Sequence, residues 1–123
     1  MQLHASGEDY LKAIFVLKKQ TGEVRSVDLA RYMGYTKPSI SHAVSTLKKG
    51  GFLAMDQEGY LHLTDIGQEV AEKIYERHFF LKNQLVMVGI DTEIAEREAC
   101  QIEHIISEET FQKIKKHLYQ SDR

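Results

Sequence analysis

The sequence has no tryptophan, one proline, one cysteine and very little net charge among its 123 residues. One cysteine excludes an internal disulfide framework and suits a reducing compartment, so we expect the protein in the cytoplasm. Apolar runs such as residues 86–90 are much shorter than a membrane span, and the N-terminus lacks the blocks of a signal peptide. We therefore expect no membrane partner. The 42% of hydrophobic residues is typical of an ordinary globular chain.

Charge is unevenly spread along the chain, although the 16 basic and 18 acidic residues nearly cancel. Residues 1–64 hold eight lysines and arginines against six acids, whereas residues 65–123 hold eight against twelve. A polyanion such as DNA attracts basic side chains. The imbalance is small, and it favours the first half as the part that contacts a nucleic acid.

Apolar residues recur at helical spacing three times in the first half of the chain. The first helix is expected to start with Ser6 as its N-cap and to end at Gly22. The second helix is expected at residues 26–33. Thr36 then caps a third helix, and Pro38 lies in its first turn, where a missing N–H costs nothing.

The pattern then changes to short strands. Residues 52–56 and 60–63 lie on either side of a turn that contains Gly59, which predicts a β-hairpin. A tight turn between the second and third helices makes a helix-turn-helix, and the following hairpin makes the winged form. The predicted fold class is mainly α with a small β-hairpin, in which residues 1–64 form a winged helix-turn-helix DNA-binding domain.

Residues 65–123 are predicted to form a helical domain. One helix begins at Asp65 and ends at Gly89, a second runs from Thr92 to about Ile106, and a third begins at Ser107. Their apolar residues exceed what so small a domain can bury alone. We therefore predict a two-fold homodimer through this domain, with contacts from Leu81, Leu85, Val86, Val88, Ile105, Ile106 and Phe111.

In helix-turn-helix proteins the second helix of the motif lies in the major groove of DNA. In this chain that helix is the one predicted after Thr36. Ile40, Val44 and Leu47 face the core by their spacing, so short polar side chains point outward. Hydroxyls can bond to bases or phosphates, and a lysine adds a phosphate contact. Alternatively, the serines are only solvent-exposed residues of a surface helix and do not contact DNA. If the helix reads double-stranded DNA, the candidate contact residues are Thr36, Lys37, Pro38, Ser39, Ser41 and His42.

A thiol, a carboxylate and an imidazole lie at helical spacing in Cys100, Glu103 and His104. These spacings place the three on one helical face, and together they form a transition-metal ligand set. His78, which interrupts an apolar stripe, and Asp9, in the first turn of the first helix, are the other candidates. Alternatively, Cys100 is a small core residue, His78 is a hydrogen-bonded core histidine, and Glu103 and His104 are exposed to solvent.

These residues resemble the diphtheria-toxin-repressor and manganese-transport-regulator family of metal-dependent transcriptional regulators. The similarity runs through residues 7–14 and 36–41 to residues 98–107, which carry the most specific motif, Cys-x-x-Glu-His. The resemblance implies a winged-helix DNA-binding part followed by a helical metal-binding and dimerisation part. It also implies a set of metal ligands, expected to be Asp9, His78, Glu96, Cys100, Glu103 and His104.

Four positions depart from the family pattern. Manganese-type members carry a second carboxylate where this chain has Lys12, and a glutamate where it has Cys100. Iron-type members carry an acid where this chain has Lys82, and a histidine where it has Glu96. Because Lys12 would repel a second cation, we do not expect a binuclear site of the manganese type.

We predict a metal-dependent DNA-binding repressor of metal-ion homeostasis. The hard ligand Asp9 favours Mn(II) or Fe(II), and the softer Cys100 favours Fe(II), Co(II) or Zn(II). Mn(II) or Fe(II) is the expected activator. The alternative is a winged-helix regulator without metal control, in which the cluster is structural. No nucleophile motif, glycine-rich phosphate loop or paired-carboxylate site supports catalysis, so we predict that the chain is not an enzyme.

Overall fold

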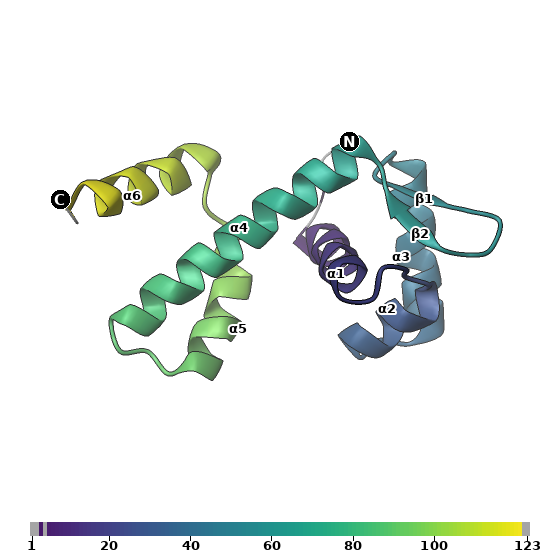
Figure 1. Cartoon of the computed structure of the whole chain (residues 1–123), viewed down its shortest axis with the longest axis horizontal. Helices are drawn as coiled ribbons and strands as arrows, with labels where there is room; N and C mark the ends of the chain where they lie inside the picture. The colour runs from purple at the N-terminus through teal and green to yellow at the C-terminus, as the bar shows by residue number, and fades with distance from the viewer. Residues whose placement is uncertain (1–2, 4, 122–123) are drawn as a thin grey trace. The chain divides into compact units, whose positions relative to one another are not determined.

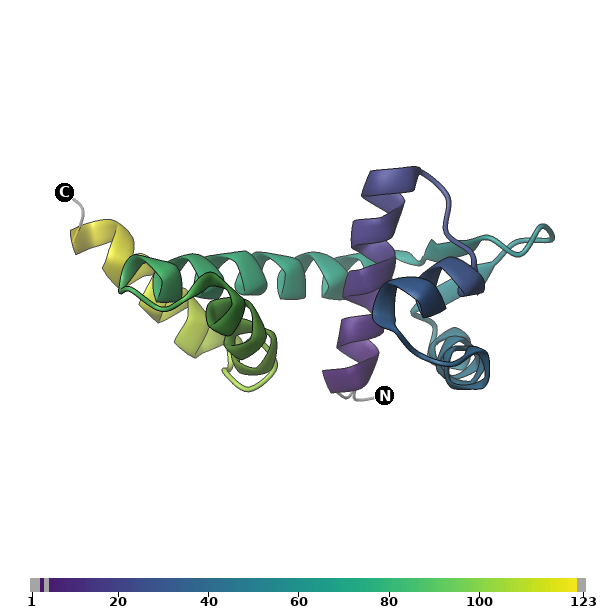
Figure 2. The same ribbon diagram turned by 90° about the horizontal axis from the view of Figure 1, so that it is seen from below.

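A computed structural model describes Leu3 and residues 5–121, which form six α-helices and one two-stranded antiparallel sheet (Figures 1 and 2). The predicted fold class is confirmed. The chain divides into two compact units, Met1–Tyr75 and Glu76–Arg123. None of the described helices is long and apolar enough to cross a membrane. The elements are α1 (Ala5–Thr21), α2 (Ser26–Met33), α3 (Lys37–Lys49), β1 (Leu53–Met55), β2 (Leu61–Leu63), α4 (Asp65–Met87), α5 (Thr92–Ile102) and α6 (Glu108–Ser121).

In the first unit, α1, α2, α3 and the hairpin enclose one hydrophobic core (Figure 1). Gly34 ends α2 in the left-handed region at φ 72°, a conformation that glycine adopts without strain. Two residues later the Thr36 hydroxyl caps α3 by accepting a hydrogen bond from the Ser39 N–H at 3.3 Å. The sharp turn between the two helices is therefore encoded locally, as predicted.

The hairpin pairs β1 antiparallel with β2, and both strands are shorter than predicted. Asp56 organises its turn. One carboxylate oxygen accepts hydrogen bonds from the backbone N–H groups of Glu58 at 3.0 Å and Tyr60 at 2.9 Å, and the other lies 2.8 Å from His62 Nε2. These bonds, the one from His62 foremost, hold the pKa of Asp56 below its ordinary value. The turn therefore rests on a carboxylate that is ionised at neutral pH.

The beginning of α4 is tied to the first strand through Thr64 and Gly67. Thr64 Oγ1 donates to the carbonyl of Gly51 at 2.7 Å and accepts a hydrogen bond from the Gly67 N–H at 3.1 Å. A β-carbon on Gly67 would stand 2.0 Å from the carbonyl oxygen of Phe52. This junction therefore requires a residue without a side chain.

Gly67→Ala is expected to lower the free energy of unfolding by about 1–3 kcal/mol, because the added methyl group must displace the backbone of Phe52. Urea denaturation followed by circular dichroism measures the change. The control is Gly7→Ala in α1, where the new methyl group meets only the flexible end of the Leu3 side chain, and where alanine favours the helix. Equal stability of the two variants would contradict the close approach at Gly67.

Exposure in the second unit agrees only in part with the predicted dimer surface. Val88 and Ile105 are 76% and 78% exposed, as expected of an interface. Phe111 is only 2% exposed, and its ring packs edge-to-face on Phe80 with 5.4 Å between the centroids. Phe111 is therefore buried within its own chain, and its inclusion among the predicted dimer contacts is wrong.

Two helix ends differ from the prediction. α1 begins at Ala5, so Ser6 lies inside the helix instead of capping it. α5 ends at Ile102 rather than near Ile106. The guanidinium group of Arg77 donates to the carbonyl oxygens of Glu103 and Ile106, at 3.1 and 2.8 Å. Because a side chain binds these acceptors, no further helical turn is needed to satisfy them.

Candidate metal centre and DNA-binding surface

The residues predicted to contact DNA lie on the exposed side of α3 and just before it. The opposite side, with Ile40, Val44 and Leu47, is buried as predicted. Thr36 and Ser39 are also joined by a hydrogen bond between their hydroxyls at 3.0 Å. A role in DNA contact stays a prediction for the six exposed residues Thr36, Lys37, Pro38, Ser39, Ser41 and His42.

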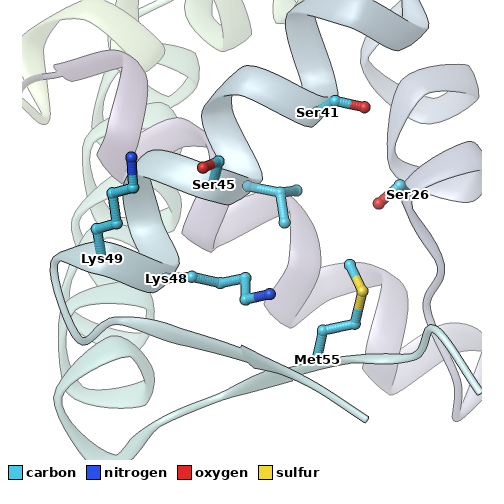
Figure 3. Close-up of a pocket in the computed structure, with 7 residues that line it drawn as sticks. Ser26, Ser41, Ser45, Lys48, Lys49 and Met55 are labelled. Atoms are coloured by element: carbon cyan, nitrogen blue, oxygen red, sulfur yellow. The ribbon is translucent and has the colours of Figure 1, made fainter. Parts of the chain in front are cut away.

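A pocket of about 370 Å³ lies between α2, α3 and β1 (Figure 3). Lys48 extends from α3 towards the strand that carries Met55. Two ammonium groups and three hydroxyls in one depression suit a phosphate group. Lys48, Lys49 and Ser26 are not among the DNA-contact residues predicted from the sequence. The lining residues are Ser26, Ser41, Val44, Ser45, Lys48, Lys49 and Met55.

His78 is the centre of a polar cluster in the second unit. It lies on α4 and is only 7% exposed. Its Nε2 atom is 2.9 Å from Glu96 Oε1, and its Nδ1 atom is 3.0 Å from Glu103 Oε2. The thiol of Cys100 lies 3.6 Å from the same Nδ1 atom. Both ring nitrogens therefore face carboxylates, and α5 supplies the thiol beside them.

Glu103 is a fully buried carboxylate, with 0% of its surface exposed. Its second oxygen, Oε1, lies 3.3 Å from Nε2 of His104. Although Glu103 follows the last residue of α5, its backbone angles of −57° and −23° are still helical, so the predicted spacing to Cys100 holds. A buried carboxylate needs strong partners, and His78 and His104 supply one imidazole for each oxygen.

Arg77 holds the turn that carries Glu103 and His104, and the sequence analysis did not identify it. Besides its two bonds to backbone carbonyls, its guanidinium donates to Glu108 Oε2 at 2.8 Å. Its side chain is 11% exposed. Sequence spacing carries no signal for this role, because the partners lie 26 to 31 residues away.

Lys82 adds a cation to the outer side of the cluster. Its Nζ atom lies 2.9 Å from Glu96 Oε2, while the other oxygen of Glu96 faces His78. Partial burial raises the pKa of Glu96, but the hydrogen bonds from Lys82 and His78 outweigh it and hold the pKa below its ordinary value. Glu96 is therefore ionised at neutral pH.

The donor set of the second unit fits a divalent transition metal. Imidazole nitrogens, carboxylate oxygens and a thiolate are ligands that such ions take. His78, Glu96 and Cys100 each offer one ligand atom, and these three atoms all lie within 4.8 Å of one another. Ligands bound at about 2.0–2.3 Å from a common ion can be separated by up to twice that distance. Small movements of the side chains would therefore bring these three atoms to one ion.

Asp9 belongs to the first unit, where it lies in the first half of α1. Its Oδ1 atom is 3.8 Å from the ammonium group of Lys12, one turn further along the helix. The lysine that departs from the manganese-type pattern is thus an ion-pair partner of Asp9. Membership of Asp9 in a metal site stays a prediction.

Both halves of the chain match the models of one protein family. Residues 2–63 match "Iron dependent repressor, N-terminal DNA binding domain", and residues 64–123 match "Iron dependent repressor, metal binding and dimerisation domain". The chain belongs to the iron dependent repressor family. The resemblance noted in the sequence is confirmed.

Individual relatives are transcriptional regulators. The chain is 35% identical over 104 residues to the transcriptional regulator MntR of Escherichia coli O157:H7, covering 85% of this chain and 67% of that protein. It is 28% identical over 110 residues to the iron-dependent repressor IdeR of Mycobacterium bovis, covering 89% and 48%. The solved structure of the manganese regulator SloR has a TM-score of 0.82 and 25% identity and covers 92% of this chain. This chain spans about half of that structure, 53%.

The prediction that the chain is not an enzyme is confirmed by its family.

Proposed function

We propose that this chain is a metal-dependent DNA-binding repressor of metal-ion homeostasis, activated in the cytoplasm by Mn(II) or Fe(II). One observation carries the proposal. A winged helix-turn-helix is followed in the same chain by a cluster of transition-metal ligands around the buried Glu103. The names of two relatives support both ions, since SloR is a manganese regulator and IdeR an iron-dependent repressor.

DNA binding is assigned to residues 1–64, and metal binding and dimerisation to residues 65–123. The support for Asp9 is its match to the family pattern, whereas the other ligands also converge within the second unit. We propose Asp9, Cys100, Glu103 and His104 as the ligands of the ion, with His78 either as a fifth ligand or, together with Glu96, as part of a weaker second site.

A homodimer is part of the proposal because the second unit leaves large apolar side chains uncovered. Met87, Val88 and Ile105 are each more than three-quarters exposed, which is unusual for a monomer of this size. A two-fold axis through this unit would place two copies of α3 in successive major grooves, about 34 Å apart. The dimer would therefore read a pseudo-palindromic site in double-stranded DNA.

The ligand chemistry narrows the choice of ion. Carboxylates such as Glu103 suit Mn(II) and Fe(II), and the thiol of Cys100 suits Fe(II) better than Mn(II). Co(II) and Zn(II) also take thiolate and imidazole ligands, so they are expected to bind in the absence of competing ions. We infer that the activating ion is selected by the types of ligand in the site together with the concentration of each ion available to the protein.

The function is tested by selecting duplexes from a random DNA library with Mn(II), with Fe(II) under anaerobic conditions, and with a chelator. We expect related half-sites in inverted orientation to be enriched only in the two metal arms. Sequence-specific enrichment of equal strength with the chelator would instead support a winged-helix regulator without metal control. No enrichment in any arm would contradict DNA recognition itself.

Lys48→Gln is expected to weaken binding to specific and non-specific duplexes alike, because it removes a cation from the pocket beside α3. For one lost phosphate contact, the slope of log affinity against log salt should fall by about 0.9. Fluorescence anisotropy at several salt concentrations measures both effects. The control is Lys113→Gln on α6, where the lysine is 77% exposed. Equal losses in the two variants would mean that the pocket makes no specific phosphate contact.

A further inference from the structure

Lys82 is a cation that the structure places directly on the carboxylate of a candidate ligand in the second unit's cluster. It stands one helical turn after His78 on α4, so both side chains reach Glu96 from the same helix face. The carboxylate of Glu96 is divided between them, with one oxygen 2.9 Å from His78 and the other 2.9 Å from Lys82. The cluster thus contains a positive charge of its own.

The ligand group formed by His78, Glu96 and Cys100 could hold an ion without help from Glu103 or His104. An ion there would bind between His78 and Oε1 of Glu96, in place of their present contact, while Lys82 stays on the other oxygen of the same carboxylate. It would also bring two further positive charges close to the Lys82 ammonium group, and like charges at such range repel strongly where water is partly excluded. With its side chain 27% exposed, Lys82 is partly shielded from solvent.

We propose that Lys82 is a built-in cation that keeps the His78, Glu96 and Cys100 group from holding a metal ion of its own. Each chain then binds a single ion, at the site that includes Glu103 and His104. This inference rests on the proposed function, because it assumes that the cluster binds metal. It assigns to Lys82 the control of how many ions each chain takes up.

Lys82 has a matched control on the same helix. Lys73 also belongs to α4, and it forms an ion pair with Glu69 at 3.7 Å, with 57% of its side chain exposed. Lys73→Gln therefore removes the same charge and an ion pair from the same helix but leaves the cluster intact. Lys82→Arg is a second control, because it keeps the positive charge next to Glu96.

The experiment measures the Co(II) bound per chain at saturation, by ultrafiltration and atomic emission, with no DNA present. We expect one ion for the unmodified chain, Lys73→Gln and Lys82→Arg, and two for Lys82→Gln. Lys82→Met, which keeps the apolar stem of the lysine, should also bind two. Circular dichroism confirms that each variant is folded.

The inference would be overturned, and the proposed function left intact, by a single ion in both Lys82→Gln and Lys82→Met, or by two ions already in the unmodified chain. A gain of a second ion in Lys73→Gln as well would also overturn it, since any loss of positive charge would then suffice. No bound Co(II), Mn(II) or Fe(II) in any variant would overturn both the inference and the proposed function.

Discussion

Glu103→Gln is expected to weaken the binding of Mn(II) and Fe(II) by about 100-fold or more, since even residues that only support metal ligands contribute about 10- to 100-fold. Glutamine has the shape of glutamate but no charge, and Glu103 is a fully buried carboxylate between two imidazoles. Metal-activated DNA binding should decline in parallel. Isothermal titration calorimetry measures the first effect, and fluorescence anisotropy at fixed metal concentration measures the second.

Glu98→Gln is the matched control for Glu103→Gln. Glu98 is an exposed glutamate of α5, so its variant removes the same charge from the same helix without changing the buried cluster. We expect it to retain the metal affinity of the unmodified chain. Unchanged metal affinity and DNA activation in both Glu103→Gln and His104→Ala would show that the cluster is structural. The metal-independent regulator would then be the better description of the protein.

Arg77→Met is expected to lower the free energy of unfolding by about 2–4 kcal/mol, because it removes hydrogen bonds from a charged donor to two carbonyls and a carboxylate. It should also weaken metal binding by about 10-fold, the effect of loosening a residue that supports a ligand. The reason is geometric: one of those carbonyls belongs to Glu103 itself. Urea denaturation and calorimetry measure the two effects separately.

Arg97→Met provides the comparison for Arg77→Met, because Arg97 is exposed on α5. It should leave stability and metal affinity close to those of the unmodified chain. Arg77→Lys separates charge from geometry, since lysine keeps the charge but lacks the planar fork that reaches several acceptors at once. If metal affinity were unchanged in Arg77→Met despite a loss of stability, the turn would not depend on Arg77 for its position.

The sequence predicted the first unit well because its signals are local. Thr36 and Gly34 mark the turn between α2 and α3, and both act within a few residues of their own position. The buried face of α3 followed from the spacing of apolar residues alone. Ser6 was misjudged because an N-cap residue and a residue within the first turn have similar sequence neighbours, and only the backbone distinguishes them.

The sequence by itself determined the elements, the winged helix-turn-helix and the types of the candidate ligands, since caps, periodicity and side-chain chemistry are properties of short segments. Only the tertiary structure decided that Glu103 is fully buried, that Arg77 binds the carbonyl of Glu103 just after α5, and that Lys82 shares Glu96 with His78. The Arg77 contact and the burial of Glu103 beside His78 join α4 to residues 25 or more positions away. Such partners are selected by how helices pack, and apolar periodicity indicates which face of a helix is buried but not which distant residue lies against it.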